Sequence, residues 1–267
     1  MKRFAFVFGM LVGCADSAPQ VLSYDEFKAQ AAVEPDTGVY IFNGDEIVTD
    51  DVAMQDMYQR YVESVYASID DGYATDEQGL IVNVVGGHDD KWDANTAANL
   101  TYCVSQSSFG SRYNAVVSAM DAAASAWEST ARVNFIHDAS QDGNCNNRNN
   151  SVLFNVRQVQ TSQYLARSFF PSTGRKGREI LISFSSFGNI SPWTLNGVLR
   201  HETGHTIGFR HEHTRPEAGT CFEDNNWRAL TAYDSSSVMH YPQCNGTQDG
   251  DLVLTSLDKS GAKLLYP

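Results

Sequence analysis

Four of the seven histidines in this 267-residue chain lie close together, in the stretch HETGHTIGFRHEH from residue 201 to 213. His201 and His205 are four residues apart, so on a helix both imidazoles project from the same face, about one turn apart. Two nitrogens in this arrangement can bind one metal ion. Glu202, beside the first histidine, is a candidate general base, because a carboxylate near a metal-activated water can accept its proton.

A third histidine can reach the same ion because a glycine stands where the helix should end. Gly208 favours a left-handed exit from the helix, and His211 follows three residues later. Three neutral imidazoles with an open fourth position are the ligand set of catalytic zinc. A fourth histidine would fill that position, so we expect His213 to be solvated or to lie behind the ligands. A chance match to HExxHxxGxxH has a probability on the order of 10⁻⁵, so the sequence predicts a zinc site.

This stretch and the downstream SSVMHYP resemble the metzincin metallopeptidases, whose signature is HExxHxxGxxH followed by a Met-turn. HETGHTIGFRHEHTRP together with SVMHY is most similar to the astacin branch and its bacterial HEIGH-type relatives. The resemblance implies that the three histidines bind zinc and that Glu202 is the general base of a peptidase. It also implies that Met239 forms the hydrophobic floor of the site and that Tyr241 binds the metal or stabilises the transition state.

The elements that must position these residues indicate an α+β catalytic domain from residue 88 to 267. One helix opens at Ser111, and the zinc helix begins at Ser191-Pro192 and stops at Gly208. Five short β-branched and aromatic runs predict the strands of a mixed sheet, at residues 100–105, 132–138, 151–158, 164–170 and 179–186. This order is the metzincin order, and TSLDKSGAKLLYP resembles its closing helix. By the same resemblance, an extended polypeptide substrate lies along residues 164–170.

Residues 14–87 are expected to form a tether and a prosegment that interacts with the catalytic domain. Apolar residues recur at helical spacing from Asp51 to about Ser68, which predicts one helix. FNGDEI, at residues 42–47, resembles the FxGD element of astacin propeptides, in which the aspartate occupies the open position on zinc. The resemblance makes Asp45 a candidate latency switch. The alternative is a simple turn, because Asn-Gly-Asp favours turns on conformational grounds.

The first thirteen residues have the pattern of an export signal, with Lys2 and Arg3 before a ten-residue apolar run. The run ends in Leu-Val-Gly before Cys14, which resembles the bacterial lipoprotein box. That resemblance implies cleavage before Cys14, a lipid anchor, and a place at the outer membrane or cell surface. Ordinary secretion, with the small residues around Cys14 as the cleavage site, is the alternative.

The remaining four cysteines can form two disulfides in an oxidising compartment. Of the three possible pairings we favour Cys103 with Cys145 and Cys221 with Cys244, because shorter loops close more readily. None of the four has the close pair spacing of a zinc knuckle, so a metal-binding role for them is disfavoured.

The formal net charge of −13 argues against nucleic acid as a partner, because phosphate binding needs a basic face. The leading hypothesis is a zinc endopeptidase, exported and made as a latent precursor. One alternative is a catalytically silent, zinc-stabilised binding or adhesion module, and another is a zinc hydrolase of other amides or esters. Glu202 favours an enzyme, because it is not a ligand in the three-histidine scheme and a structural site would not need it.

Overall fold

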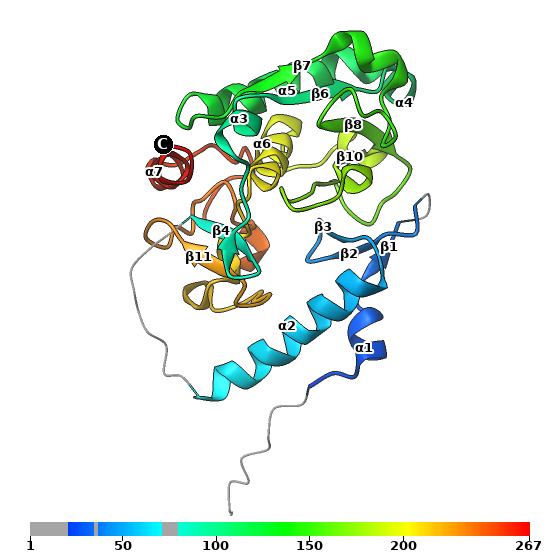
Figure 1. The fold of residues 1–267 in the computed structure, drawn as a ribbon. Coiled ribbons are helices and arrows are strands. Elements are labelled where there is room, and N and C mark those ends of the chain that lie inside the picture. Colours follow the sequence, from blue (N-terminus) through cyan, green and yellow to red (C-terminus); the bar gives the residue numbers. More distant parts are fainter. Residues whose placement is uncertain (1–20, 35–36, 71–79) are drawn as a thin grey trace, which may run out of the picture.

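The computed structural model describes residues 21–34, 37–70 and 80–267, which form a small N-terminal unit and a larger domain (Figure 1). The predicted signal peptide, residues 1–13, and the predicted lipidation site at Cys14 lie outside the described residues. Within the described part of the chain, no helix combines the length and the apolar composition that crossing a membrane requires.

The larger domain is built on a five-stranded sheet in the order β7-β6-β8-β10-β9. Four strands are parallel, and β9 pairs antiparallel with β10 at one edge. The strands are β6 (Leu100–Val104), β7 (Phe135–His137), β8 (Phe154–Val159), β9 (Ala166–Arg167) and β10 (Glu179–Ser183). Each overlaps one of the five predicted runs, so the structure confirms the α+β class and the mixed sheet.

Two long helices, α5 (Tyr113–Glu128) and α6 (Leu195–Thr206), pack on the sheet face that carries Ile180 and Ile182. They are joined where the Trp127 indole donates a hydrogen bond of 2.9 Å to the Arg200 carbonyl oxygen. The apolar face of α5 fills the centre of the domain core, so α6 is held on a rigid support.

The predicted start of the zinc helix at Ser191-Pro192 was wrong. Both residues lie in the middle of a turn, in which the Trp193 N–H donates to the Ile190 carbonyl oxygen at 2.8 Å. Helix α6 begins after Thr194, whose hydroxyl accepts the Gly197 N–H at 2.9 Å. A threonine hydroxyl caps a helix through the same chemistry as a serine hydroxyl, and here the cap is Thr194.

A three-stranded sheet, β11-β4-β5, lies beside the end of α6 (Figure 1). Strand β4 pairs antiparallel with β11, and Val82 belongs to the domain core. The remaining strands and α-helices of this domain are β4 (Ile81–Val85), β5 (His88–Asp89), β11 (Trp227–Ala229), α3 (Ala94–Ala97), α4 (Gln106–Phe109) and α7 (Ser256–Leu265). The boundary at residue 87 stays a prediction, but these contacts favour a boundary before Leu80, because β4 is built into the larger domain.

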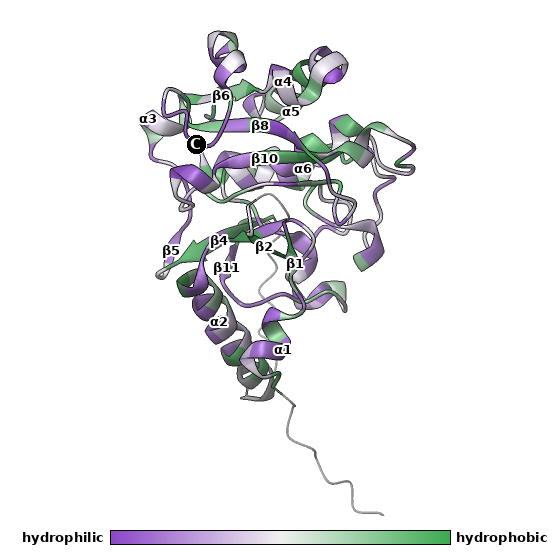
Figure 2. Cartoon of the chain, turned by 90° about the vertical axis from the view of Figure 1, so that its right-hand side faces the viewer, coloured by the Kyte–Doolittle hydropathy of each residue, from purple (hydrophilic) through white to green (hydrophobic). Residues whose placement is uncertain are grey.

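The N-terminal unit has an apolar cluster of its own, centred on Phe27, Phe42, Val48 and Met54. It consists of α1 (Tyr24–Lys28), β1 (Ala32–Val33), β2 (Tyr40–Phe42), β3 (Glu46–Val48) and α2 (Asp51–Asp70). Helix α2 confirms the helix predicted from Asp51 onward. The small sheet β1-β2-β3 lies between these helices and the central sheet, as Figures 1 and 2 both show.

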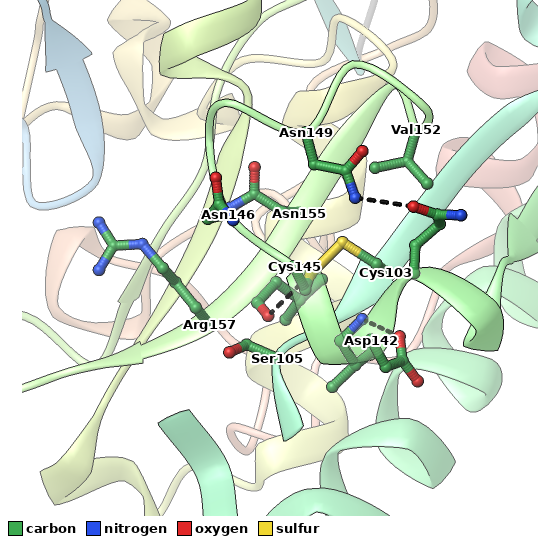
Figure 3. The surroundings of a disulfide bond; sticks show 12 residues. Cys103, Ser105, Asp142, Cys145, Asn146, Asn149, Val152, Asn155 and Arg157 are labelled. Carbon is green, nitrogen blue, oxygen red and sulfur yellow. Dashed lines mark hydrogen bonds between the residues drawn. A yellow bond between two sulfur atoms is a disulfide. The ribbon is translucent and has the colours of Figure 1, made fainter. Parts of the chain in front are cut away.

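Both favoured disulfide pairings are present in the structure. Cys103 on β6 is bonded to Cys145, beneath the asparagine-rich loop that follows β7 (Figure 3). Cys221 is bonded to Cys244, which links the segment after the third predicted ligand to the segment after Tyr241. The second bond therefore closes the loop that contains the predicted Met-turn.

Candidate active site

Helix α6 ends where the chain must turn to bring the third histidine back. Gly208 has φ +98°, a conformation that other residues rarely adopt, and a Cβ added there would clash with the Asp90 carbonyl oxygen. The turn is fixed on the far side by the bridge between Phe209 and Val82 of β4. The glycine bend predicted from the sequence is therefore present, and His211 follows it directly.

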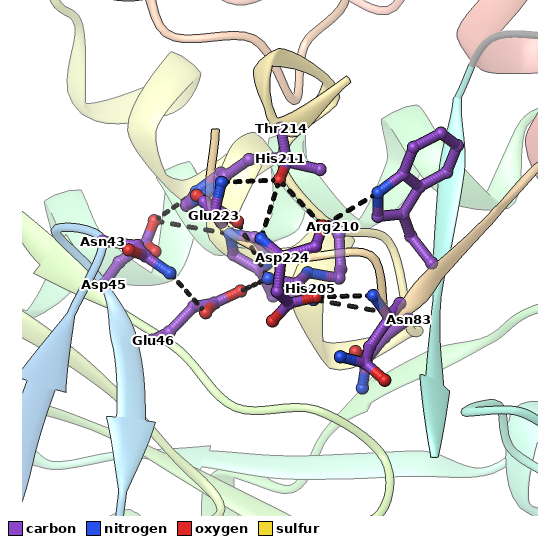
Figure 4. A network of polar contacts seen from close by, with 12 residues as sticks. Asn43, Asp45, Glu46, Asn83, His205, Arg210, His211, Thr214, Glu223 and Asp224 are labelled. Atoms are coloured by element: carbon purple, nitrogen blue, oxygen red, sulfur yellow. Dashed lines mark hydrogen bonds and ion pairs between the residues drawn. The ribbon is translucent and has the colours of Figure 1, made fainter. Parts of the chain in front are cut away.

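The three predicted ligands converge on one carboxylate oxygen from the N-terminal unit. Asp45 Oδ2 lies 3.3 Å from His201 Nε2, 3.3 Å from His205 Nε2 and 3.1 Å from His211 Nε2. His201 Nε2 and His205 Nε2 are themselves 3.2 Å apart. All four side chains are buried, and Figure 4 shows Asp45 reaching this cluster from the tip between β2 and β3.

The other nitrogen of each imidazole has an acceptor that fixes the ring. His201 Nδ1 lies 2.8 Å from the Val238 carbonyl oxygen, and His205 Nδ1 lies 2.7 Å from that of Phe209. A carbonyl oxygen can only accept, so both Nδ1 atoms carry the proton and both Nε2 atoms present a lone pair to the shared point. His211 Nδ1 is oriented in the same way by Glu223 Oε1 at 2.6 Å.

This arrangement fits a divalent metal ion. A single proton shared between a histidine and Asp45 could account for only one of the three contacts, the one with His211. Burial lowers the pKa of His211, but the Asp45 and Glu223 carboxylates raise it. His201 stays neutral, because burial lowers its pKa to about 4. Separations of 3.1–3.3 Å between donor atoms are also close to the edge of about 3.3 Å that a tetrahedron with zinc–ligand bonds of about 2.0 Å requires. Three nitrogens and one oxygen form a suitable zinc donor set.

The predicted catalytic residues lie at the same point. Glu202 is buried, and its Oε2 has no hydrogen-bond partner among the described residues. Burial raises the pKa of Glu202 well above its usual value, and the Asp45 charge adds to this effect. The Tyr241 hydroxyl donates to Asp45 Oδ2 at 2.6 Å, and its ring stacks on His201. Burial also raises the pKa of Tyr241, so the phenol stays protonated and can donate a hydrogen bond.

Met239 packs against α6, and its role as the floor of the metal site stays a prediction. It is fully buried, and a Cβ added to Gly204 of α6 would come within 2.6 Å of its sulfur. The turn is held by Asp258 of α7, which accepts hydrogen bonds from the Ser237 hydroxyl at 2.6 Å and the Val238 N–H at 2.9 Å. Because the Val238 carbonyl oxygen also accepts a hydrogen bond from His201 Nδ1, α7 supports the orientation of the first ligand.

Glu223 is a site residue that the sequence reasoning missed. It accepts from His211 Nδ1, lies 3.3 Å from His213 Nε2, and pairs with Arg210 at 2.9 Å. His213 was expected to be either solvated or placed behind the ligands. It is buried and its ring stacks on that of His211, so it lies behind the ligands. No motif spacing marks Glu223. The one signal in the sequence was its place two residues after Cys221, because the predicted disulfide to Cys244 brings this segment close to the Met-turn.

A cavity of about 260 Å³ adjoins the site on the side of β9. Its lining includes Leu165, Ala166, Trp193, Val198, Glu202 and Tyr241. The predicted substrate strand, residues 164–170, therefore borders both the cavity and the general base. Its binding of substrate remains a prediction.

Comparison with known proteins places the chain in a family. The model of Metallo-peptidase family M12 matches residues 56–247, so the chain belongs to this family of metallopeptidases. The match confirms the class of enzyme that the zinc motif predicted.

The chain is also similar to individual members. It is 33% identical over 103 residues to Zinc metalloproteinase nas-30 of Caenorhabditis elegans, covering 32% of this chain and 13% of that protein. It is 29% identical over 89 residues to High choriolytic enzyme 2 of Oryzias latipes, covering 27% of this chain and 30% of that protein. Among solved structures, myroilysin matches with a TM-score of 0.48 and 18% identity over 70% of this chain and 98% of that one. The matched regions thus span less than a third of these curated relatives.

Proposed function

We propose that the chain is a zinc-dependent endopeptidase, made as a precursor in which Asp45 blocks the catalytic position. The observation that carries this proposal is the single oxygen, Asp45 Oδ2, within 3.3 Å of three imidazole nitrogens and 2.6 Å from the Tyr241 hydroxyl. A carboxylate is a competent zinc ligand, so it can take the place that a water molecule needs.

The residues of the site have separate roles in peptide hydrolysis. His201, His205 and His211 would hold the ion, and the chemistry that zinc supplies when bound is polarisation of the scissile carbonyl and acidification of a water molecule. Glu202 accepts a proton from the attacking water and returns it to the leaving amine. The Tyr241 phenol donates a hydrogen bond to the developing oxyanion.

The conformation of the hairpin tip supports a blocking role for Asp45. Asn43 and Gly44 both have positive φ, at 53° and 96°, so β2 turns sharply into β3 and presents the aspartate at its end. A Cβ on Gly44 would lie 3.3 Å from the Tyr241 hydroxyl, so the glycine allows a close approach. Glu46 pairs with Arg210 at 3.2 Å and anchors the far side of the tip.

Export and lipidation at Cys14 are part of the same proposal. The two disulfides support an oxidising compartment, because such bonds are rare in reducing ones. Release of the enzyme then requires cleavage of the chain before Leu80, so that β4 remains with the larger domain.

The test compares the full chain before and after limited proteolysis, with zinc content and peptide-library cleavage as readouts. We expect one zinc per chain throughout, and cleavage only after proteolysis or in the full chain carrying Asp45→Ala. Glu202→Ala should keep zinc and lose about 10²–10⁴-fold in activity, because it removes the general base. Asp121→Ala, at an exposed position on α5, is the control for Asp45→Ala.

Two results would contradict the proposal. Equal activity of Glu202→Ala and the unaltered chain would remove the assigned mechanism. Equal activity of the full chain with and without Asp45 would remove the latency role and leave the peptidase assignment intact.

A further inference from the structure

A buried ion pair joins the N-terminal unit to the edge strand of the central sheet, away from the metal site. Glu34 follows β1, and its carboxylate accepts from Arg167 Nε at 3.1 Å and from Arg167 Nη2 at 3.0 Å. The Tyr164 hydroxyl donates to the same carboxylate at 2.7 Å. Glu34 and Arg167 are 0% and 1% exposed, so the pair is desolvated.

Arg167 has little else to bind in the larger domain. Its other described hydrogen bond goes from Nη1 to the Glu179 carbonyl oxygen at 3.3 Å. The Glu179 carboxylate is already engaged, by Arg157 at 2.8 Å and by the Asn155 amide at 2.6 Å. When the N-terminal unit leaves, a guanidinium therefore loses the one carboxylate that pairs with it among the described residues, and a buried cation without a partner is unfavourable.

The position of this pair connects it with substrate binding. Arg167 lies on β9, and the hydroxyl of its neighbour Ser168 donates to the Glu202 carbonyl oxygen at 2.8 Å. Tyr164 lines the cavity beside Glu202 and also packs against Ile41 of β2. The N-terminal unit thus places an acidic and an apolar side chain against the strand that borders the general base.

We propose that Tyr164 and Arg167 form a carboxylate-binding subsite, which Glu34 fills in the precursor and an acidic side chain of the polypeptide substrate fills in the processed enzyme. This inference rests on the proposed function. The planar guanidinium offers two parallel N–H donors, which suit a carboxylate better than a neutral amide, and the tyrosine adds a third. The subsite therefore selects glutamate or aspartate at one position of the substrate.

Binding can be tested in the full chain without any catalysis. Glu34→Ala empties the subsite, and sodium propionate is the probe, with sodium chloride at equal ionic strength as the control. We expect a saturable rise in the thermal midpoint of Glu34→Ala with propionate and no such rise in the unaltered chain, whose subsite is full. In Glu34→Ala combined with Arg167→Met the rise should be absent. An equal rise in both variants, or no rise in either, overturns the inference.

Specificity is tested with the chain activated by limited proteolysis, on peptide pairs that differ only by Glu or Gln at each position in turn. We expect kcat/KM to favour Glu at one position by at least about tenfold, the size expected for a hydrogen-bonded charge. The ratio should fall to near one in Arg167→Met and persist in Arg157→Met, because Arg157 pairs with Glu179 of its own domain.

The two arms separate the failure of this inference from failure of the proposed function. If peptides are cleaved with a Glu-to-Gln ratio near one at every position, the subsite is refuted and the peptidase stands. If no peptide is cleaved, the proposed function fails, and the propionate titration alone decides whether Arg167 binds a carboxylate.

Discussion

Substitution of Glu223 should weaken zinc binding although this residue does not face the ion. Its Oε1 lies 2.6 Å from His211 Nδ1 and holds that ring with Nε2 toward the other two ligands. The contact is buried and charged, so Glu223→Gln keeps an acceptor but loses the charge that makes His211 a stronger donor to the metal. Loss of such a supporting group typically lowers metal affinity about 10–100-fold, or about 1.4–2.7 kcal/mol.

The assay is competition for zinc between the full chain and a chromophoric chelator at fixed pH and salt. Asp224→Asn is the matched control, because Asp224 pairs with the same Arg210, at 2.7 Å, and makes no hydrogen bond or ion pair with a ligand histidine among the described residues. We expect Asp224→Asn to bind zinc within a few-fold of the unaltered chain. An equal loss of affinity in both variants, or none in Glu223→Gln, would refute the idea that this carboxylate orients the third ligand.

Two further predictions concern stability. Gly208→Ala forces a side chain into a positive-φ turn against the Asp90 carbonyl oxygen, so we expect the folded state to lose about 1–3 kcal/mol of stability. The thermal midpoint should fall by several degrees, and zinc binding should weaken. An unchanged midpoint would contradict this prediction. Burial alone would raise the pKa of Glu34, but Arg167 outweighs it and lowers that pKa below the usual 4.5. Its stabilisation is therefore present above pH 4.5 and is lost as pH falls further, so urea unfolding of the unaltered chain and Glu34→Gln should differ most near neutral pH and converge in acid; a constant gap would exclude the linkage.

The parts of the site that the sequence predicted are those set by local geometry. The spacing of His201 and His205 on one helical face, and the glycine bend before His211, depend on only a few neighbouring residues. The strands were predictable for a similar reason, because short β-branched runs between turn residues carry their own signal. The recognised signature added the Met-turn and Tyr241, which lie too far along the chain for spacing to place them.

The missed features all depend on contacts between distant segments. Glu223 meets His211 through a loop whose path no periodicity describes, and Glu34 meets Arg167 across 133 positions of the sequence. The β-branched run of β4 marks a strand but not its partner, which is β11, nearly 150 residues later. A carboxylate in an acidic chain has many possible partners, so its type and position alone do not identify which cation it will meet.

The contacts of the N-terminal unit suggest how latency and substrate choice are related. Three of its carboxylates meet groups of the larger domain: Asp45 the histidines, Glu46 the Arg210 guanidinium and Glu34 the Arg167 guanidinium. The unit also keeps its own apolar cluster, so release requires separation of this interface and does not require loss of that cluster. Arg210 retains Glu223 and Asp224 after such a separation, whereas Arg167 retains no paired carboxylate among the described residues. After release, the Arg167 guanidinium on β9 therefore lacks a carboxylate partner in the described part of the larger domain, whereas the charge of Arg210 remains neutralised by two carboxylates. A preference for an acidic side chain is thus expected at a single position of the substrate.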